Sequence, residues 1–159
     1  MNTLSKTGSR PEIREFSLNR FWKRSRPAST YSRQQKMDSD RARIQADLAG
    51  QLSGSIRCDD NYLQMYASDA SIYEVQPSGV VFPANTDDVV ACVRYAEAND
   101  LSVIPRGGGS NVTGGCVGNG LVLDFSYSMR RVKAVERDSV TVEPGIVLGE
   151  LNRQLQTHD

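Results

Sequence analysis

The sequence predicts an α+β fold in which a βαβ unit is followed by a β-hairpin, and three observations support it. A helical apolar pattern at 85–99 lies between two short apolar runs, as in a strand–helix–strand unit. Residues 132–143 alternate apolar and polar side chains around a polar centre, as a hairpin does. The first 36 residues are polar and basic, which is typical of a disordered tail.

The charge distribution separates the same two regions. The chain holds 19 basic and 19 acidic residues. Residues 1–43 contain 11 of the basic and 4 of the acidic ones, whereas residues 44–159 contain 8 and 15. We therefore expect a basic disordered tail over 1–36 and a folded, acidic domain over 37–159. Because the net charge is zero, no nucleic-acid partner is expected.

The basic tail allows several interpretations. It can be an arm that binds nucleic acid, or a transit peptide, although Glu12 and Glu15 argue against the latter. A third hypothesis is that Met37 is the true start, because ordered patterning begins just after it. Detection of a peptide from 1–36 in the mature protein would exclude that hypothesis.

The cysteines and the single histidine do not form a recognisable metal motif. Cys58, Cys92 and Cys116 are widely spaced without a C-x-x-C, and His158 lies at the end of the chain. We expect no metal site, no disulfide framework and a cytoplasmic location. No run approaches the roughly 18 apolar residues of a membrane span, and no secretory signal is visible.

One helix precedes the βαβ unit. Ile44, Leu48 and Leu52 recur at every fourth residue, which predicts a helix over 38–52 with a cap at 38–40. The segments that follow are a short strand at 56–58, a turn at 59–61 and an irregular loop anchored by tyrosines at 62–77.

The βαβ unit places its strands at 80–83 and 101–105. Its helix, 85–99, is expected to begin at a Thr86 cap and to end at Asn99 in a left-handed conformation. The expected apolar face of this helix consists of Val89, Val90, Val93, Ala96 and Ala98.

The chain continues with a third strand at 121–125, the hairpin strands 132–136 and 140–143, and a helix at 146–156. Pro144 and Gly145 separate the hairpin from that helix. Because no closing strand follows the helix, we expect the chain to be a fragment of something longer.

A glycine-rich loop follows the second strand of the βαβ unit. Residues 107–115 contain five glycines, which permit sharp turns and expose backbone N–H groups. Such a concavity suits a phosphate group. Ser110 and Asn111 add donors, and Arg106 adds a charge. The alternative is a flexible surface turn that binds nothing.

Several ordered segments carry a resemblance to a known family. They are SDASIYEVQPSGVVFPANTDDVVACVRYAEANDLSVIPRGGGSNVTGG, then GLVLDFSYSMRRV, then VTVEPGIVLGELNRQL. Over about residues 44–158 the chain resembles the FAD-binding domain of the p-cresol methylhydroxylase/vanillyl-alcohol oxidase (PCMH) type. Within that type it looks closest to FAD-linked D-2-hydroxyacid dehydrogenases, those of D-lactate and glycolate.

The resemblance implies a cofactor site. Its loop would wrap the FAD pyrophosphate with Pro105, Arg106, Gly107, Gly108, Gly109, Ser110 and Asn111. Gly114 and Gly115 would allow close approach to the flavin, and Pro144 and Gly145 match a turn that touches the flavin nucleotide. Asp69 and Ser71 match a small-polar run with a structural role. Relatives that bind flavin covalently often have histidine where this chain has Ser110, so FAD is expected to be non-covalent.

The chain departs from the family pattern at two positions. Gly115 stands where glutamine is common, and Asp159 where glycine is common. The catalytic residues of such relatives lie beyond residue 159, so no catalytic residue is assigned and the chain alone is expected to be inactive.

The predicted function is the FAD-binding portion of a flavin-dependent oxidoreductase. Its substrate would be a 2-hydroxyacid such as D-lactate, and an unidentified acceptor would take the electrons. One alternative is a flavoprotein of the UDP-N-acetylenolpyruvylglucosamine reductase type, which has a similar glycine loop. The other is a non-catalytic remnant or a basic-tailed binding module.

Overall fold

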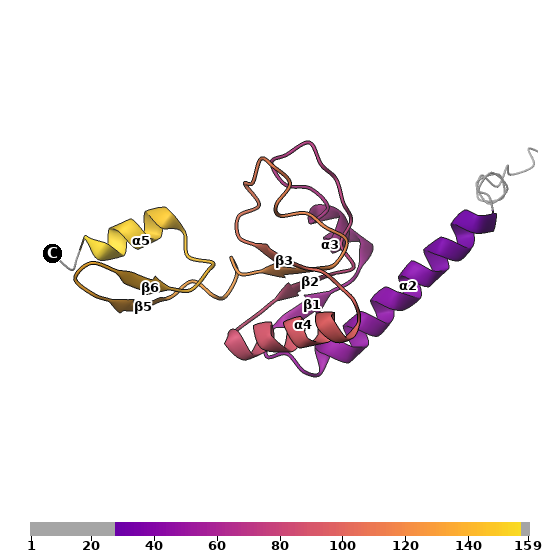
Figure 1. The fold of residues 1–159 in the computed structure, drawn as a ribbon, viewed down its shortest axis with the longest axis horizontal. Helices are drawn as coiled ribbons and strands as arrows, with labels where there is room; N and C mark the ends of the chain where they lie inside the picture. The colour runs from indigo at the N-terminus through magenta and orange to yellow at the C-terminus, as the bar shows by residue number, and fades with distance from the viewer. Residues whose placement is uncertain (1–27, 157–159) are drawn as a thin grey trace, which may run out of the picture. The chain divides into compact units, whose positions relative to one another are not determined.

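The computed structural model describes residues 28–156, and its helices and strands are labelled in Figure 1. The chain divides into two compact units, Met1–Gln35 and Lys36–Asp159. Of the first unit only residues 28–35 are described, and they are helical. Residues 1–27 of the expected tail, and also His158 and Asp159, lie outside the described residues.

A four-stranded sheet forms the centre of the second unit, with strand order β1-β2-β4-β3. Strand β1 (Ser55–Arg57) runs antiparallel to β2 (Gly79–Phe82). Strand β4 (Leu121–Asp124) lies between β2 and β3 (Val103–Arg106) and is parallel to both. The expected strand–helix–strand unit is therefore present, but a third strand is inserted between its two strands.

Helices cover both faces of this sheet (Figure 1). All four residues of β4 are buried, because side chains alternate between the faces and each face is covered. The first face packs on helices α2 (Ala28–Ala49) and α4 (Thr86–Ala98), and its core is Ile44, Leu48, Ile56, Cys58, Val81, Cys92, Ala96, Leu121 and Leu123. The second face packs on α3 (Asp60–Met65), and its core is Leu63, Val80, Ile104 and Val122.

The predicted hairpin and the helix after it are confirmed in the C-terminal segment. Strands β5 (Val132–Val135) and β6 (Val140–Val142) pair antiparallel, and helix α5 (Leu148–Leu155) follows. Glu143, directly after β6, is only 2% exposed. Its carboxylate accepts hydrogen bonds from the Arg131 side chain and backbone N–H, and Lys133 Nζ lies 3.3 Å away. These contacts, those of Arg131 first, lower the pKa of Glu143 to about 2.

Two expectations about helix starts were wrong. Helix α2 begins at Ala28, so residues 28–36 are helical rather than part of a disordered tail, and 38–40 do not cap it. The stretch is rich in helix-forming residues and no breaker interrupts it after Pro27. A start at Met37 would fall inside this helix. Residues 59–61 are not a turn, because Asp59 caps α3 by accepting the Tyr62 N–H.

The buried face of α4 also differs from the expected one. Val90 and Val93 are 41% and 47% exposed, whereas Ala96 is buried as expected and Asp88 and Cys92 are buried without having been predicted. The Asp88 carboxylate accepts the backbone N–H groups of Ser53, Gly54 and Ala84 at 2.8 to 2.9 Å, which turns that side of the helix inward. The N-cap is Asn85 rather than Thr86, and the left-handed residue after the helix is Asp100 rather than Asn99.

Candidate nucleotide-binding site

The three parallel strands end at one edge of the sheet. Phe82 ends β2, Asp124 ends β4 and Arg106 ends β3, and the last two are paired in register. Ligands of open sheets in α/β folds bind outside the carboxyl ends of the strands. This edge is therefore where a ligand site is expected.

A buried carboxylate and an aromatic cluster fill this edge. Asp124 is 5% exposed and accepts the Tyr66 hydroxyl at 2.5 Å and the Ser126 N–H and hydroxyl at 2.8 and 2.6 Å. Burial and this hydrogen bond raise the pKa of Tyr66 above its ordinary value, so the phenol stays a donor. The Phe82 ring meets Tyr62, Tyr66 and Tyr127 edge to face, with ring centroids 6.0 to 6.1 Å apart.

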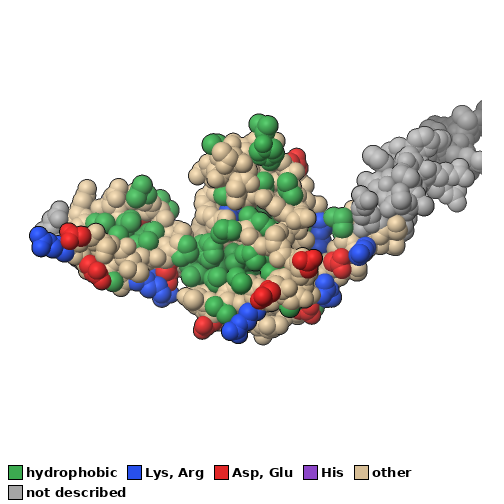
Figure 2. All heavy atoms as spheres, in the orientation of Figure 1, with side chains coloured by type: hydrophobic (Ala, Val, Ile, Leu, Met, Phe, Trp, Pro, Cys, Tyr) green, Lys and Arg blue, Asp and Glu red, His purple; other side chains and the backbone are tan. Residues whose placement is uncertain are grey.

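The glycine loop makes the connection from β3 to β4. Neighbouring parallel strands need a crossover, and here residues 107–120 supply it. Figure 1 shows the loop beside the segment that follows α3. Figure 2 shows hydrophobic side chains at the tip of these two segments. Within these two segments Ile72, Tyr73 and Val112 are exposed, at 95%, 55% and 72%.

Two glycines of the loop have a left-handed backbone. Gly109 has φ +67° and Gly114 has φ +82°, and no other described glycine has a positive φ. A Cβ on Gly109 would lie 2.5 Å from Arg106 Nη2, and one on Gly114 would lie 2.7 Å from Tyr73 Cδ2. Both glycines are therefore required by contacts within the chain, besides any role toward a ligand.

Asn111 shapes the second half of the loop. Its Oδ1 accepts the N–H groups of Thr113 and Gly115 at 2.8 and 2.9 Å, and the Thr113 hydroxyl at 2.9 Å. The amide oxygen is thus occupied by the loop itself. The sequence predicted that the Asn111 side chain donates a hydrogen bond to a ligand, and only its Nδ2 group can do so.

Arg106 is also tied to the chain. Its Nη1 donates to the carbonyl oxygens of Ser68 at 2.9 Å and Cys116 at 3.3 Å. Its guanidinium carbon lies 5.0 Å from the centroid of the Tyr66 ring. The expected positive charge is therefore present at the loop. The Nη1 group of the guanidinium, however, already donates to backbone carbonyls of the protein.

Residues 107–110, which we call the cradle, present unused donors. Among the described residues, none accepts a hydrogen bond from the backbone N–H of Gly107, Gly108, Gly109 or Ser110. A Cβ placed on Gly107 or Gly108 would meet no atom within 4 Å. No contact with the described residues requires glycine at these two positions. Consecutive free N–H groups beside open space fit the oxygens of a phosphate group.

The remaining predicted residues lie in two places. Pro105 pairs with Leu123 in the sheet, and Ser110 is exposed in the cradle. Gly145 lies against the residue that follows β4, because a Cβ there would be 1.9 Å from the Phe125 oxygen, and its N–H donates to the Met129 carbonyl at 2.8 Å. The Phe125 N–H in turn donates to the Arg106 carbonyl at 3.0 Å. Pro144 beside it is exposed. Sequence reasoning missed Tyr66 and Asp124, although a carboxylate within an otherwise apolar predicted strand was a visible signal.

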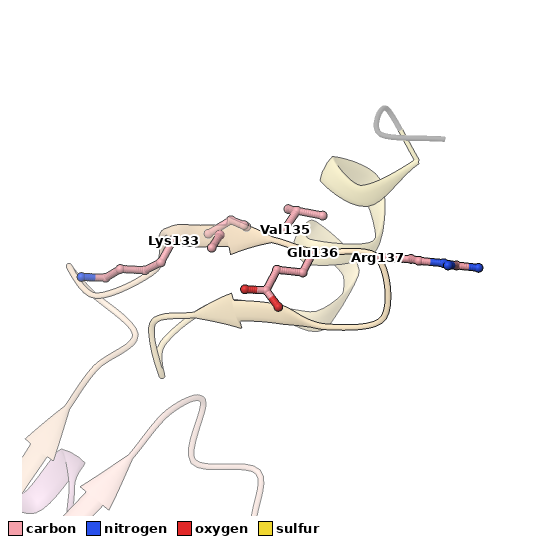
Figure 3. Close-up of a pocket in the computed structure, with 6 residues that line it drawn as sticks. Lys133, Val135, Glu136 and Arg137 are labelled. Atoms are coloured by element: carbon pink, nitrogen blue, oxygen red, sulfur yellow. The ribbon is translucent and has the colours of Figure 1, made fainter.

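The described residues also form hollows whose linings do not include residues 107–110. A hollow of about 620 Å³ lies beside the hairpin and is lined by residues 132–137. Figure 3 shows the side chains of Lys133 and Arg137 pointing to opposite ends of it, so they do not converge. Within residues 28–156 no group of three potential metal ligands is found. No helix in that range combines the length and apolar character needed to cross a membrane.

Comparison with known proteins places this fold. The FAD binding domain family matches residues 77–159. The chain is 36% identical over 95 residues to an Escherichia coli D-2-hydroxyglutarate dehydrogenase, covering 57% of this chain and 9% of that protein. It is 29% identical over 114 residues to the Bacillus subtilis glycolate oxidase subunit GlcD, covering 67% and 24%. The structure is similar to 4-ethylphenol oxidase from Gulosibacter chungangensis, with TM-score 0.65, 21% identity, and coverage of 76% of this chain and 25% of that one.

The strand order defines an α+β domain, and the cradle lies at the carboxyl ends of its parallel strands. The chain belongs to the FAD-binding domain family, in agreement with the PCMH-type flavoprotein that the sequence predicts. It spans 9% to 24% of the length of the two relatives described above.

Proposed function

We propose that the chain is the part of a flavin-dependent oxidoreductase that binds the FAD pyrophosphate, and that the cradle makes the contact. The observation that carries this proposal is the row of four unpaired N–H groups at the carboxyl edge of the sheet. Pro105, Arg106, Asn111, Gly114 and Gly115 would support the cradle. Pro144 and Gly145 stay proposed cofactor contacts on the resemblance alone.

The proposed reaction is oxidation of a 2-hydroxyacid. FAD supplies the redox chemistry when bound, and this chain contributes binding and orientation. The similarity to D-2-hydroxyglutarate dehydrogenase and to a glycolate oxidase subunit supports this substrate class over a UDP-N-acetylenolpyruvylglucosamine reductase. D-lactate is a candidate substrate, and an unidentified acceptor takes the electrons. No residue of this chain is assigned to catalysis.

We propose further that FAD is held without a covalent bond. Ser110 is exposed in the cradle, at the position where covalent relatives often have histidine. A serine hydroxyl does not form the histidyl–flavin bond. A cytoplasmic location is proposed as well, and it is supported by Cys58, Cys92 and Cys116, which are all free thiols.

The experiment purifies the protein from its native cells with a tag on its own gene, and mass spectrometry establishes its length. If the native protein extends beyond residue 159, we expect bound flavin that acid releases intact, with an absorbance band that bleaches when D-lactate, glycolate or D-2-hydroxyglutarate is added without oxygen. A colourless protein that FAD cannot reconstitute would refute the proposed function. DNA binding with a steep salt dependence and no flavin would favour the basic-tailed binding module instead.

A further inference from the structure

We propose that Asp69 and Arg106 are positioning residues that hold the cradle in its binding shape by fastening the loop to residues 66–76. This inference rests on the proposed function, because it assigns the way in which the same site is kept ready for an anion. We call the two side chains and their contacts the clamp.

Arg106 closes the loop on itself. Its guanidinium stands at the start of the loop, and its Nη1 reaches the carbonyl of Cys116 near the far end and that of Ser68 in the neighbouring segment. The left-handed turn at Gly109 lies against the same guanidinium, where a side chain would collide with it. The cradle is therefore shaped around Arg106.

Asp69 provides the second fastening. Its Oδ2 accepts the Cys116 N–H at 3.3 Å, and its Oδ1 accepts the Ser71 N–H at 2.9 Å. Hydrogen bonding by the Ser71 side chain, together with these N–H groups, lowers the pKa of Asp69. Cys116 is thus held at both its N–H and its carbonyl, one by each member of the clamp.

The segment that carries Asp69 is itself closed. Val75 N–H donates to the Ala67 carbonyl at 2.8 Å, and Ser68 and Glu74 form an antiparallel bridge. The Tyr73 ring packs on Gly114 of the loop. A closed segment of this kind can fix the loop, because it does not have to be ordered when a ligand arrives.

Charge and position make opposite predictions for Asp69. A carboxylate beside an anion site repels the anion, so charge alone predicts that Asp69→Asn tightens anion binding. The clamp predicts weaker binding, because an asparagine keeps only one acceptor atom for two N–H donors. Arg106→Lys separates the two effects in the same way: it keeps the charge but loses the planar guanidinium, whose Nη1 donates to both carbonyls and whose Nη2 lies against Gly109.

The experiment titrates ADP, a probe with two linked phosphates, into the ¹⁵N-labelled 159-residue chain, with adenosine as the probe without phosphate. In the wild type we expect ADP, but not adenosine, to shift the amide signals of residues 107–110. In Asp69→Asn and in Arg106→Lys we expect the ADP dissociation constant to rise about tenfold. Hydrogen exchange at the Cys116 N–H should speed up by a similar factor in Asp69→Asn, while exchange in β4 stays unchanged. Asp138→Asn and Arg94→Lys, at exposed positions, serve as matched controls and should behave as wild type.

The outcomes are distinguishable. No ADP response in the wild type would overturn the proposed function, and the clamp as a device for that site would fall with it. A wild-type response with unchanged or tighter ADP binding in a folded Asp69→Asn would overturn the clamp alone, and so would an unchanged Cys116 exchange rate. If Arg106→Lys does not fold, Asp69→Asn still decides between these results.

Discussion

Adjacent glycines in the cradle should respond in opposite ways to the same substitution. Gly109 has φ +67°, and its missing Cβ leaves room for Arg106. Gly108 has no positive φ, and a Cβ there would meet no atom within 4 Å. Left-handed backbone costs an alanine about 1–2 kcal/mol, and displacing Arg106 loses hydrogen bonds worth about 1 kcal/mol each. Gly109→Ala should therefore lower the free energy of unfolding by about 2–4 kcal/mol.

Gly108→Ala should leave stability unchanged or raise it by up to about 1 kcal/mol, because it only restricts the unfolded chain. Its methyl group would occupy the open side of the cradle, so the ADP dissociation constant should rise about tenfold, the equivalent of one lost hydrogen bond to a charged group. Urea unfolding and ADP titration of both variants test this. Wild-type stability in Gly109→Ala, or wild-type ADP affinity in Gly108→Ala, would refute the reasoning.

Three more predictions concern the stability of the fold. The lowered pKa of Glu143 means that its stabilising effect is complete above about pH 4.5 and is lost as the pH falls toward about 2. In Glu143→Gln, urea unfolding across that window should therefore depend less on pH, and an equal slope in both proteins would exclude this assignment. Tyr66→Phe leaves buried Asp124 without one donor and should cost about 1–3 kcal/mol in urea unfolding, whereas exposed Tyr127→Phe should not; equal stabilities would contradict the hydrogen bond. Leu48→Ala, at a fully buried site, should cost about 2–5 kcal/mol by the same assay, and a loss below 1 kcal/mol would place Leu48 outside the core.

Much of the fold follows from local patterns in the sequence. The strands at 79–82, 103–106 and 121–124, the helix at 86–98 and the hairpin lie within a few residues of their predicted positions. Each of these elements shows a regular spacing of apolar residues or a clear turn signal. Such signals lie within the element itself and do not depend on residues far away in the sequence. The glycine loop was visible for the same reason, and the resemblance it supports agrees with the family match.

The tertiary structure alone decided which groups meet. It decided that β4 is inserted between β2 and β3. The hydrogen bonds of Asp88 to Gly54, Asp69 to Cys116 and Asp124 to Tyr66 join residues 34 to 58 positions apart. Periodicity does not specify such long-range hydrogen bonds, because they depend on which backbone groups the folded chain leaves without a partner. The sequence by itself determined the α+β domain and predicted that its glycine loop binds a phosphate group. Only the folded chain showed that Arg106 and Asn111 hold that loop together, while the N–H groups of 107–110 stay free. The physical reason is that a polar group bonded within the chain is not available to a ligand, and the fold decides which groups are bonded in this way.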